Sequence, residues 1–227
     1  MASAPPARPA RIAETRQKRA GEAMRQRSRE RLVLAAAEVF AEQGYAGATV
    51  TAIAERAGVS LRTLYTAWGS KRRLLRAYVE YTMTGSPTAV TEGTWVPQLQ
   101  RLLDPESLAD PQARMRQVAR IVREIAERMG LAWRLVRDGA AIDPGVAEDH
   151  AELERLRRRS MAGLLEGIDE GSLRPGLTLD RAIDTTLVIA SPSAYETLVH
   201  PGGYSMDEFE RWVGDTLITA LLADPRP

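Results

Sequence analysis

A short polar segment at residues 60–66 carries the side chains best suited to recognise another molecule. The planar guanidinium of Arg62 can donate two hydrogen bonds to the edge of a guanine, while the hydroxyl and methyl groups of Thr63 and Thr66 suit phosphates and thymine methyls. Lys71 stands at the expected start of the following helix, where free N–H groups and the helix dipole already favour a phosphate. These residue types and spacings indicate binding to DNA.

Two short helices joined by a three-residue turn are predicted to position these side chains. The first opens at Thr49 or Val50 and stops at Gly58, which permits a sharp turn. Ser60 can cap the second helix, Leu61–Ala67, by accepting hydrogen bonds from its first free N–H groups. The N-terminal residues of this second helix can then enter the major groove, as in helix-turn-helix proteins.

The stretch from Arg31 to Leu75, about a fifth of the chain, resembles the DNA-binding domain of the TetR/AcrR family of transcriptional regulators. The matching motifs are, in chain order, Leu34-Ala35-Ala36-Ala37-Glu38-Val39-Phe40, Gly44-Tyr45, Thr49-Val50, Ile53-Ala54, Ala57-Gly58-Val59-Ser60, Thr63-Leu64-Tyr65 and Gly69-Ser70-Lys71. Their order and spacing make the resemblance specific. It implies an all-α fold, with an N-terminal three-helix helix-turn-helix domain followed by a helical domain for ligand binding and dimerisation.

The resemblance also assigns a set of residues to DNA binding. Tyr65 and Thr49 are implied as contacts to the DNA backbone, whereas Leu64 is assigned to the core. The full candidate set is Thr49, Thr51, Ser60, Leu61, Arg62, Thr63, Tyr65, Thr66 and Lys71.

Two residues depart from the family pattern. Family members often carry His followed by Phe where this chain has Ala67 and Trp68. Trp68 can fill the aromatic core position, but the side chain of Ala67 cannot donate a hydrogen bond to a phosphate. The neighbouring basic residues are the candidates to supply replacement charge: Arg72, Arg73 and Arg76.

Charge is unevenly distributed along the chain. Residues 1–80 hold 15 Lys/Arg against 7 Asp/Glu, and residues 81–227 hold 16 against 23. A basic first third joined to an acidic remainder is expected when one end meets a polyanion. We therefore divide the chain into a flexible basic arm at 1–24, a helix-turn-helix domain at 25–83 and an effector-binding and dimerisation domain at 84–227. Part of Arg11–Met24 could extend the first helix, and the arm could contact DNA or remain a solvated tail.

Beyond residue 84 the pattern predicts helices without strands. After a connector at 85–93 and a short helix at 97–103, apolar residues recur every three or four positions from 112 to 129. Gly130 is expected to break that helix, and a long helix is expected at 143–169. Segments 179–199, with a kink or restart at Pro192, and 206–222 are the helices that the family resemblance implies for a homodimer. Their apolar faces alone could equally be buried within one subunit.

Met and Trp side chains on the helices before and within this long helix suit an irregular apolar ligand. The chain is therefore expected to bind a small-molecule effector that is partly apolar, although the same spacing is equally typical of a buried core. The candidate ligand-binding residues are Trp95, Met115, Val118, Val122, Met129, Trp133 and His150.

Other functions find no matching pattern. No apolar run is long enough to span a membrane, and a chain with no cysteine fits a reducing cytoplasm and excludes zinc ribbons. An enzyme is disfavoured because nucleophile elbows and phosphate-binding glycine loops are missing from the sequence. Two histidines without ligand-like spacing argue against a metal, and no cofactor is expected.

These observations predict a regulator that represses transcription, binds a palindromic operator on double-stranded DNA as a dimer, and is released by its effector. An activator of the same family and a ligand-independent architectural DNA-binding protein are the alternatives. The architectural alternative predicts basic charge throughout, contrary to the acidic second part of the chain.

Overall fold

The computed structural model describes residues 8–84, 92–104 and 110–223. Within these ranges the regular elements are helices, apart from one antiparallel bridge between Leu173 and Leu222, which confirms the all-α prediction. The helices are α1 (Arg8–Gly47), α2 (Val50–Arg56), α3 (Leu61–Trp68), α4 (Lys71–Thr84), α5 (Glu92–Gln100), α6 (Pro111–Ala140), α7 (Pro144–Leu165), the short 3-10 turn η2 (Glu170–Ser172), α8 (Leu179–Ile189), α9 (Pro192–Val199) and α10 (Met206–Leu221).

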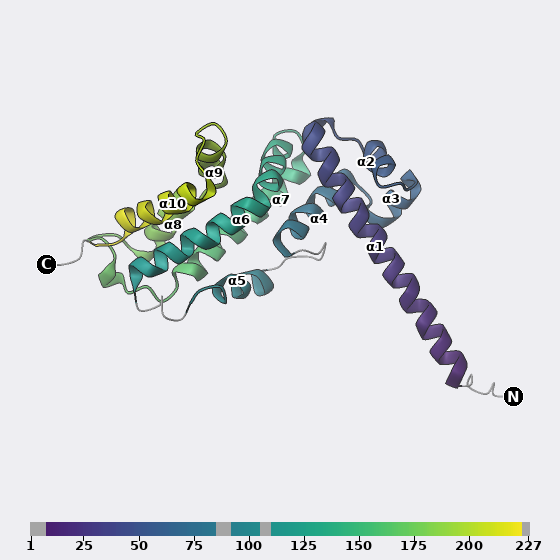
Figure 1. Ribbon diagram of the computed structural model, residues 1–227, viewed down its shortest axis with the longest axis horizontal. Coiled ribbons are helices and arrows are strands. Elements are labelled where there is room, and N and C mark those ends of the chain that lie inside the picture. Colours follow the sequence, from purple (N-terminus) through teal and green to yellow (C-terminus); the bar gives the residue numbers. More distant parts are fainter. Residues whose placement is uncertain (1–7, 85–91, 105–109, 224–227) are drawn as a thin grey trace.

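The first helices pack into a small body around a shared apolar core (Figure 1). Its largest fully buried side chains are Leu32, Phe40, Ile53, Leu64 and Leu74. Because α2 and α3 are too short to be stable alone, their positions depend on this core.

Side-chain oxygens start both short helices, as predicted. Thr49 Oγ1 accepts a hydrogen bond from the N–H of Ala52, and Ser60 Oγ accepts one from the N–H of Thr63, each at 3.1 Å. Gly58, between the two helices, has a φ of +63°, which a residue with a Cβ rarely adopts. The structure thus confirms the helix-turn-helix and the chemistry that was expected to build it.

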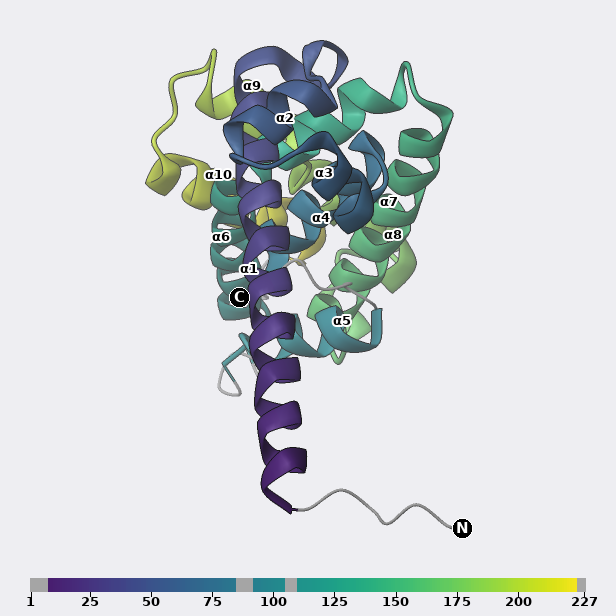
Figure 2. The same ribbon diagram turned by 90° about the vertical axis from the view of Figure 1, so that its right-hand side faces the viewer.

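The first helix is longer than the sequence pattern predicted. Because α1 begins at Arg8, residues 8–24 are helical, which agrees with the alternative that Arg11–Met24 extends the first helix and not with a wholly flexible arm; residues 1–7 lie outside the described residues. Ala, Arg, Glu and Gln dominate this stretch, and all of them favour helix. Extending an existing helix also needs no new nucleus. Figures 1 and 2 show the N-terminal half of α1 projecting away from the rest of the molecule.

The second domain is built around α6. Phe209, Val213 and Leu217 of α10 are fully buried, and Gly214 of α10 faces Ala119 of α6, where a Cβ in its place would make an ordinary van der Waals contact at 3.5 Å. Helix α7 packs on α6 as well, and α5 and α8 pack on α7. This places α6 at the centre of a helical layer, as Figure 1 shows.

Several predicted boundaries in this domain were wrong. Helix α6 continues through Gly130, where a break was expected. The glycine instead allows a close approach, because a Cβ there would lie 2.8 Å from Cε1 of Tyr195 on α9. Helix α7 ends at Leu165 and not at Asp169. The short helix expected at 97–103 is α5, and most of the predicted connector at 85–93 lies outside the described residues.

Helix α4 joins the two domains. It packs on α1 on the DNA-binding side and on α6 and α7 on the other side. Buried residues of both domains therefore form one continuous apolar core.

Candidate functional site

Helix α3 turns one face to the core and the other to solvent. Leu64 and Trp68 are buried, as predicted for Leu64, whereas Arg62 and Thr63 are exposed and Tyr65 is 52% exposed. No acidic residue in the described part of the chain pairs with Arg62, so its guanidinium is available to an outside acceptor. This exposed face is called the reading face below, and it consists of Leu61, Arg62, Thr63, Tyr65 and Thr66.

Some hydroxyl groups near the reading face are already engaged. Ser60 Oγ lies 2.9 Å from Thr63 Oγ1 while it caps α3, and Thr66 Oγ1 donates to the carbonyl of Arg62 at 2.8 Å. The proton of the Thr66 hydroxyl is therefore used within the helix. The methyl group of Thr66 remains free for an apolar contact. Thr51, in the first turn of α2, is exposed.

Lys71 has an internal role in addition to the phosphate contact predicted for it. Its Nζ donates to the carbonyls of Tyr45 and Ala48 at 2.7 and 3.0 Å and lies 4.3 Å from the centre of the Tyr45 ring. Partial burial lowers the pKa of this ammonium group. Lys71 thus ties the start of α4 to the turn after α1, and only its third proton is left for a phosphate.

Two of the three arginines expected to replace the missing histidine are used elsewhere. Arg72 Nε and Nη2 donate to the two carboxylate oxygens of Asp149 on α7, at 2.7 and 2.9 Å. Arg76 Nη1 lies 3.2 Å from Asp149 and 3.1 Å from Glu152. These four residues, called the α4–α7 clamp, join the DNA-binding domain to the second domain. Arg73 is exposed, and no acidic residue of the described ranges pairs with it, so only Arg73 fits that expectation.

A second polar contact lies beside the clamp. The hydroxyl of Tyr45 donates to Asp143 Oδ2 at 2.7 Å, and Oδ1 of the same carboxylate accepts from the first N–H groups of α7. The hydrogen bond from Tyr45, followed by the backbone N–H groups, holds the pKa of Asp143 below its usual range. Burial, together with this hydrogen bond, raises the pKa of Tyr45. The start of α7 is therefore fixed to the turn that precedes α2.

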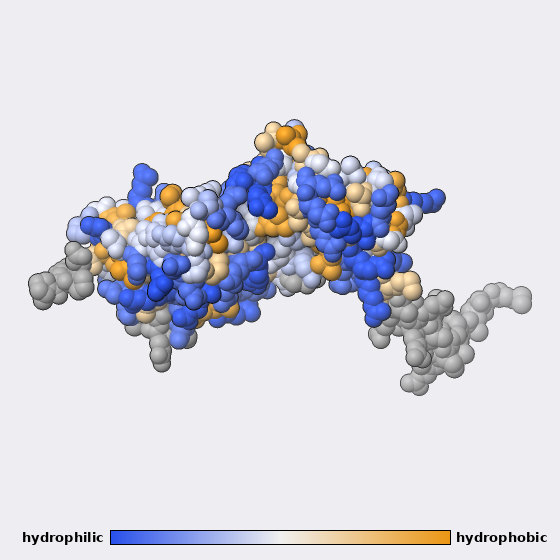
Figure 3. Space-filling model, turned by 45° about the horizontal axis from the view of Figure 1, so that its top comes forward, coloured by the Kyte–Doolittle hydropathy of each residue, from blue (hydrophilic) through white to orange (hydrophobic). Residues whose placement is uncertain are grey.

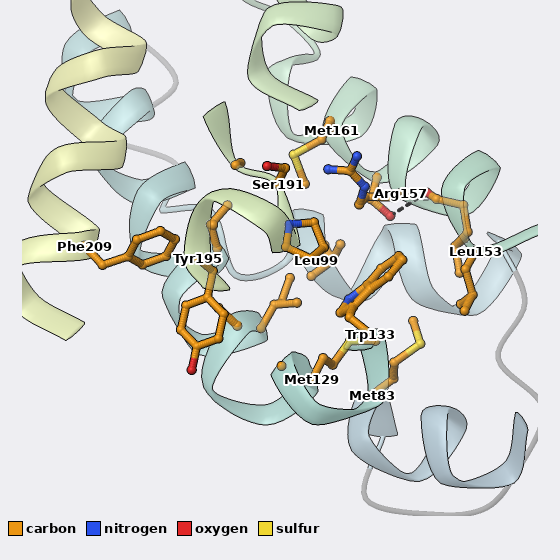
Figure 4. Close-up of a pocket in the computed structure, with 18 residues that line it drawn as sticks. Met83, Leu99, Met129, Trp133, Leu153, Arg157, Met161, Ser191, Tyr195 and Phe209 are labelled. Atoms are coloured by element: carbon orange, nitrogen blue, oxygen red, sulfur yellow. Dashed lines mark hydrogen bonds between the residues drawn. The ribbon is translucent and has the colours of Figure 1, made fainter. Parts of the chain in front are cut away.

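An apolar cavity lies inside the second domain, between α6, α7 and α9 (Figure 4). The space open to the centre of a water-sized sphere is about 70 Å³. The wall is formed by Met83, Leu99, Val122, Ile125, Ala126, Met129, Gly130, Trp133, Leu153, Leu156, Arg157, Ser160, Met161, Ala190, Ser191, Pro192, Tyr195 and Phe209. Three methionines and three aromatic side chains give it the adaptable apolar surface that irregular ligands require.

Polar groups in the cavity wall are mostly satisfied within the protein. Arg157 donates to the carbonyl of Leu187 at 2.9 Å and to Glu154, and Ser160 donates to the carbonyl of Leu156 at 2.9 Å. An apolar molecule could therefore enter without leaving these groups unpaired.

The mouth of the cavity opens into a polar hollow that shares Gly130, Trp133, Arg157 and Tyr195 with it. Charged and titratable side chains line this hollow: Glu127, Arg134, Arg137, His150, Glu154, Glu196 and His200.

The seven predicted ligand-binding residues divide into four groups. Val122, Met129 and Trp133 line the cavity, and His150 lines the polar hollow with its ring 6.5 Å from that of Trp133. Met115 and Val118 are fully buried and are not part of the cavity wall, which corrects their assignment. They share the apolar stripe of α6, but this helix is longer than the cavity, and its first turns serve the core. Trp95 lies in α5, and its side chain is outside the described residues.

Sequence reasoning missed most of the α7 and α9 wall. Leu153, Leu156 and Met161 are spaced along the inner side of α7, and Ile125 continues the stripe already recognised on α6. Pro192 and Tyr195 belong to a segment that was assigned to the dimer interface. The signal available in the sequence was Gly130, because a glycine within a continuous apolar stripe indicates close approach of another group.

Helix α7 connects the two regions. Asp149 of the α4–α7 clamp immediately precedes His150 of the polar hollow, and Leu153 of the cavity wall follows one turn later. A displacement of α7 by a bound molecule would therefore reach the base of α4 through a single rigid helix.

A helix-turn-helix domain built from α1, α2 and α3, beside a larger helical domain, defines the class of helix-turn-helix transcriptional regulators. Within that class, the N-terminal part of the chain carries the DNA-binding domain of the TetR family. The family described as "Bacterial regulatory proteins, tetR family" matches residues 32–78, which span most of α4 and most of the packed part of α1 through α3. This family and the relatives of the chain are transcriptional regulators and not enzymes.

Individual proteins match longer stretches of the chain than the family model does. The chain is 28% identical over 170 residues, 74% of its length and 77% of the relative's, to the uncharacterized HTH-type transcriptional regulator YdeS of Bacillus subtilis. NalD of Pseudomonas aeruginosa, described as the secondary repressor of the MexAB-OprM multidrug efflux pump, superposes with a TM-score of 0.63 at 18% identity, covering 88% of this chain and 98% of NalD. FadR of Bacillus subtilis, solved in complex with stearoyl-CoA, gives a TM-score of 0.61 at 18% identity over 84% of this chain and 97% of FadR. At these identities the two solved structures show a shared fold.

None of the helices in the described ranges has the length and apolar character to cross a membrane. Across the same residues His, Asp and Glu side chains do not gather into a group that could hold a metal ion.

Proposed function

We propose that this protein is a dimeric repressor that binds a palindromic operator and is released when a partly apolar small molecule enters the cavity. The observation that carries the proposal is the position of α7, which contributes Asp149 to the α4–α7 clamp and Leu153 to the cavity wall. The protein would act in the cytoplasm, where chromosomal DNA is found.

DNA recognition is assigned to the reading face, with Arg62 as the principal base contact. Thr49, Thr51, Ser60 and Lys71 surround this face and are assigned to the DNA backbone. One short helix reads few bases, so two copies about one helical turn of DNA apart are needed for a specific site. A palindromic operator follows from the twofold symmetry of such a dimer.

The homodimer is assigned to α8 and α10. These two helices pack against each other, and Val188 of α8 is 73% exposed, an unusual position for a large apolar side chain. Trp212 and Ile218 of α10 are half-buried. Pairing of the two helices with those of a second copy would remove these surfaces from water. Helix α9 contributes less than predicted, because Pro192 and Tyr195 face the cavity.

The effector is assigned to the apolar cavity. The relatives support a ligand of this kind: NalD is described as a repressor of a multidrug efflux pump, and FadR was solved with the acyl compound stearoyl-CoA. In the proposed mechanism the ligand displaces α7, and the α4–α7 clamp carries that displacement to α4 and the reading face. The ligand must favour the released state by about 2–5 kcal/mol for a useful switch.

Gel-shift binding of the purified protein to the DNA flanking its own gene tests the DNA half of the proposal. Wild type should bind this DNA specifically, and Arg62→Ala should weaken binding about 5- to 150-fold, the range for one good base contact. Arg128→Ala, an exposed arginine on α6, is the matched control and should bind like wild type. If wild type prefers neither this DNA nor any sequence selected from a random pool, the proposed function is wrong.

The ligand half is tested by crystal structures of the dimer with and without an effector found by screening for DNA release. The distance between the two α3 helices should differ between the states. Identical spacing in both would contradict the proposed mechanism.

A further inference from the structure

The N-terminal half of α1 projects away from the packed part of the molecule (Figures 1 and 2). Among the described side chains of α1, which begin at residue 23, large buried ones begin at Leu32, and residues 23–27 are exposed. At 1.5 Å per residue, the stretch from Arg8 to Ser28 extends about 30 Å beyond the packed part. A projecting helix gains little from tertiary packing, so its stability comes from helix propensity and from whatever it binds.

The sequence of this segment is strongly basic. Between residues 8 and 31 there are nine Lys/Arg and three Asp/Glu. Arg25, Arg27 and Arg31 are exposed. Figure 3 shows strongly hydrophilic residues around the place where α1 leaves the body. Such a concentration of positive charge on one projecting element fits a polyanion.

The base of the projecting part of α1 is bonded to the C-terminal end of α3. Arg29 Nη1 donates to the carbonyl of Ala67 at 2.6 Å, and its guanidinium lies 3.8 Å from the centre of the Trp68 ring. Trp68 in turn donates through Nε1 to the carbonyl of Arg29 at 3.4 Å. Arg29 therefore covers the C-terminal end of α3, the position at which the family's usual histidine is replaced by Ala67.

The direction in which α1 projects is also suitable for a contact with DNA bound at α3. Figure 2 views the molecule from the side that carries α2 and α3, and α1 runs along that same face and continues past the rest of the molecule. A shallow groove between α1, the end of α3 and α4 is lined by Arg29, Ala67, Trp68, Arg73, Arg76, Ala77 and Glu80. Its single carboxylate, Glu80, is paired with Arg76. Arg29 and Arg73 thus add positive charge between the end of α3 and the base of the projecting helix.

We infer that residues 8–31 form a rigid basic helix that binds the phosphate backbone of DNA flanking the base-read site. This inference rests on the proposed function, because it needs the reading face to place the protein on DNA. A helix about 30 Å long can reach phosphates up to about 9 base pairs away from the site read by α3. The contact adds affinity and lengthens the protected DNA without reading its sequence.

The test compares two duplexes that contain the operator selected by the full chain from a random pool. One ends at the outermost base pair of the selected site, and the other continues for about 12 base pairs on each side, beyond the reach of the helix. Wild type should bind the long duplex at least about tenfold more tightly. The variant with Arg16, Arg19, Arg25 and Arg27 changed to Gln should bind the two duplexes equally, and its salt slope on the long duplex should fall by about 2–4 per protomer.

Two further variants separate charge from folding. Changing the same four arginines to Lys keeps both helix propensity and charge, so it should bind like wild type. Changing four exposed arginines of the second domain to Gln, at Arg101, Arg116, Arg120 and Arg128, should also leave the preference for long flanks intact. Equal binding of both duplexes by wild type, or an undiminished flank preference in the first Gln variant, would overturn the inference. Neither result bears on the proposed function, which fails if wild type prefers no DNA sequence over random DNA.

Discussion

The reading face of α3 and the cavity of the second domain recognise their partners by opposite means. On α3 the side chains are exposed, and Arg62 has hydrogen-bond donors that no residue of the described ranges uses. In the cavity the wall is apolar, and the polar groups of Arg157 and Ser160 are already bonded to backbone carbonyls. A polyanion is held by donors that remain unsatisfied, whereas an apolar ligand is held where no donor is left over. One chain therefore keeps its two kinds of recognition apart and connects them through α7.

The largest expected effect separates the two sides of α3. Leu64→Ala should destabilise the protein by about 2–5 kcal/mol, because it leaves a cavity in a fully buried core. Arg62→Ala, two residues earlier, should change stability by less than about 0.5 kcal/mol while it weakens DNA binding. Urea denaturation measures the first quantity, and gel shift measures the second. Equal destabilisation by both substitutions would show that the reading face is part of the packing.

Filling the cavity should remove ligand binding without affecting the affinity of the protein for DNA. Ala126→Phe places a ring in the cavity, so binding of a fluorescent apolar dye such as anilinonaphthalene sulfonate should weaken at least tenfold, about 1.4 kcal/mol. Ala151→Phe, on the exposed side of α7, is the control and should bind the dye like wild type. Dye binding that survives Ala126→Phe unchanged would place the ligand elsewhere.

Breaking the α4–α7 clamp should uncouple the two regions. Asp149→Asn removes the charge that faces Arg72 and Arg76, both of which are partly solvent-exposed, so the melting temperature should fall by no more than about 4 °C. The loss of DNA affinity caused by an effector should shrink severalfold, while effector affinity in the absence of DNA changes little. Gel-shift titrations with and without effector measure this coupling. An unchanged effector response would exclude the clamp as the route.

The smallest effect concerns the hydrogen bond between Tyr45 and Asp143. Because the pKa of Asp143 is lowered in the folded protein, this stabilisation is complete above the unfolded pKa near 4 and is lost as the pH falls through the folded value. Tyr45→Phe should therefore cost about 1 kcal/mol at about pH 5–8. The difference from wild type should shrink below about pH 4. A difference that grows in acid would contradict this assignment.

The sequence predicted the DNA-reading region far better than the cavity. The caps Thr49 and Ser60, the turn at Gly58 and the core position of Leu64 lie within a few residues of one another, so local rules decide them. The cavity wall draws on α5, α6, α7, α9 and α10 and on the end of α4, and its position depends on how α9 meets α6 over Gly130. No local pattern encodes that meeting. The arginines of α4 illustrate the same limit, since their partners on α7 lie more than 70 positions away.

The packing of α10 on α6 also has a consequence for how the chain is made. All residues of α1–α4 have been synthesised by about residue 84, but the apolar face of α6 meets its main cover only when α10 has been synthesised, about 80 residues after α6 ends. At bacterial elongation rates this interval lasts about 4–16 s. During that time the nascent chain carries a finished DNA-binding domain and an uncovered hydrophobic helix. A chain that stops before Met206 would leave the apolar face of α6 exposed permanently. Truncated products should therefore be substrates for chaperones and proteases before they could occupy an operator.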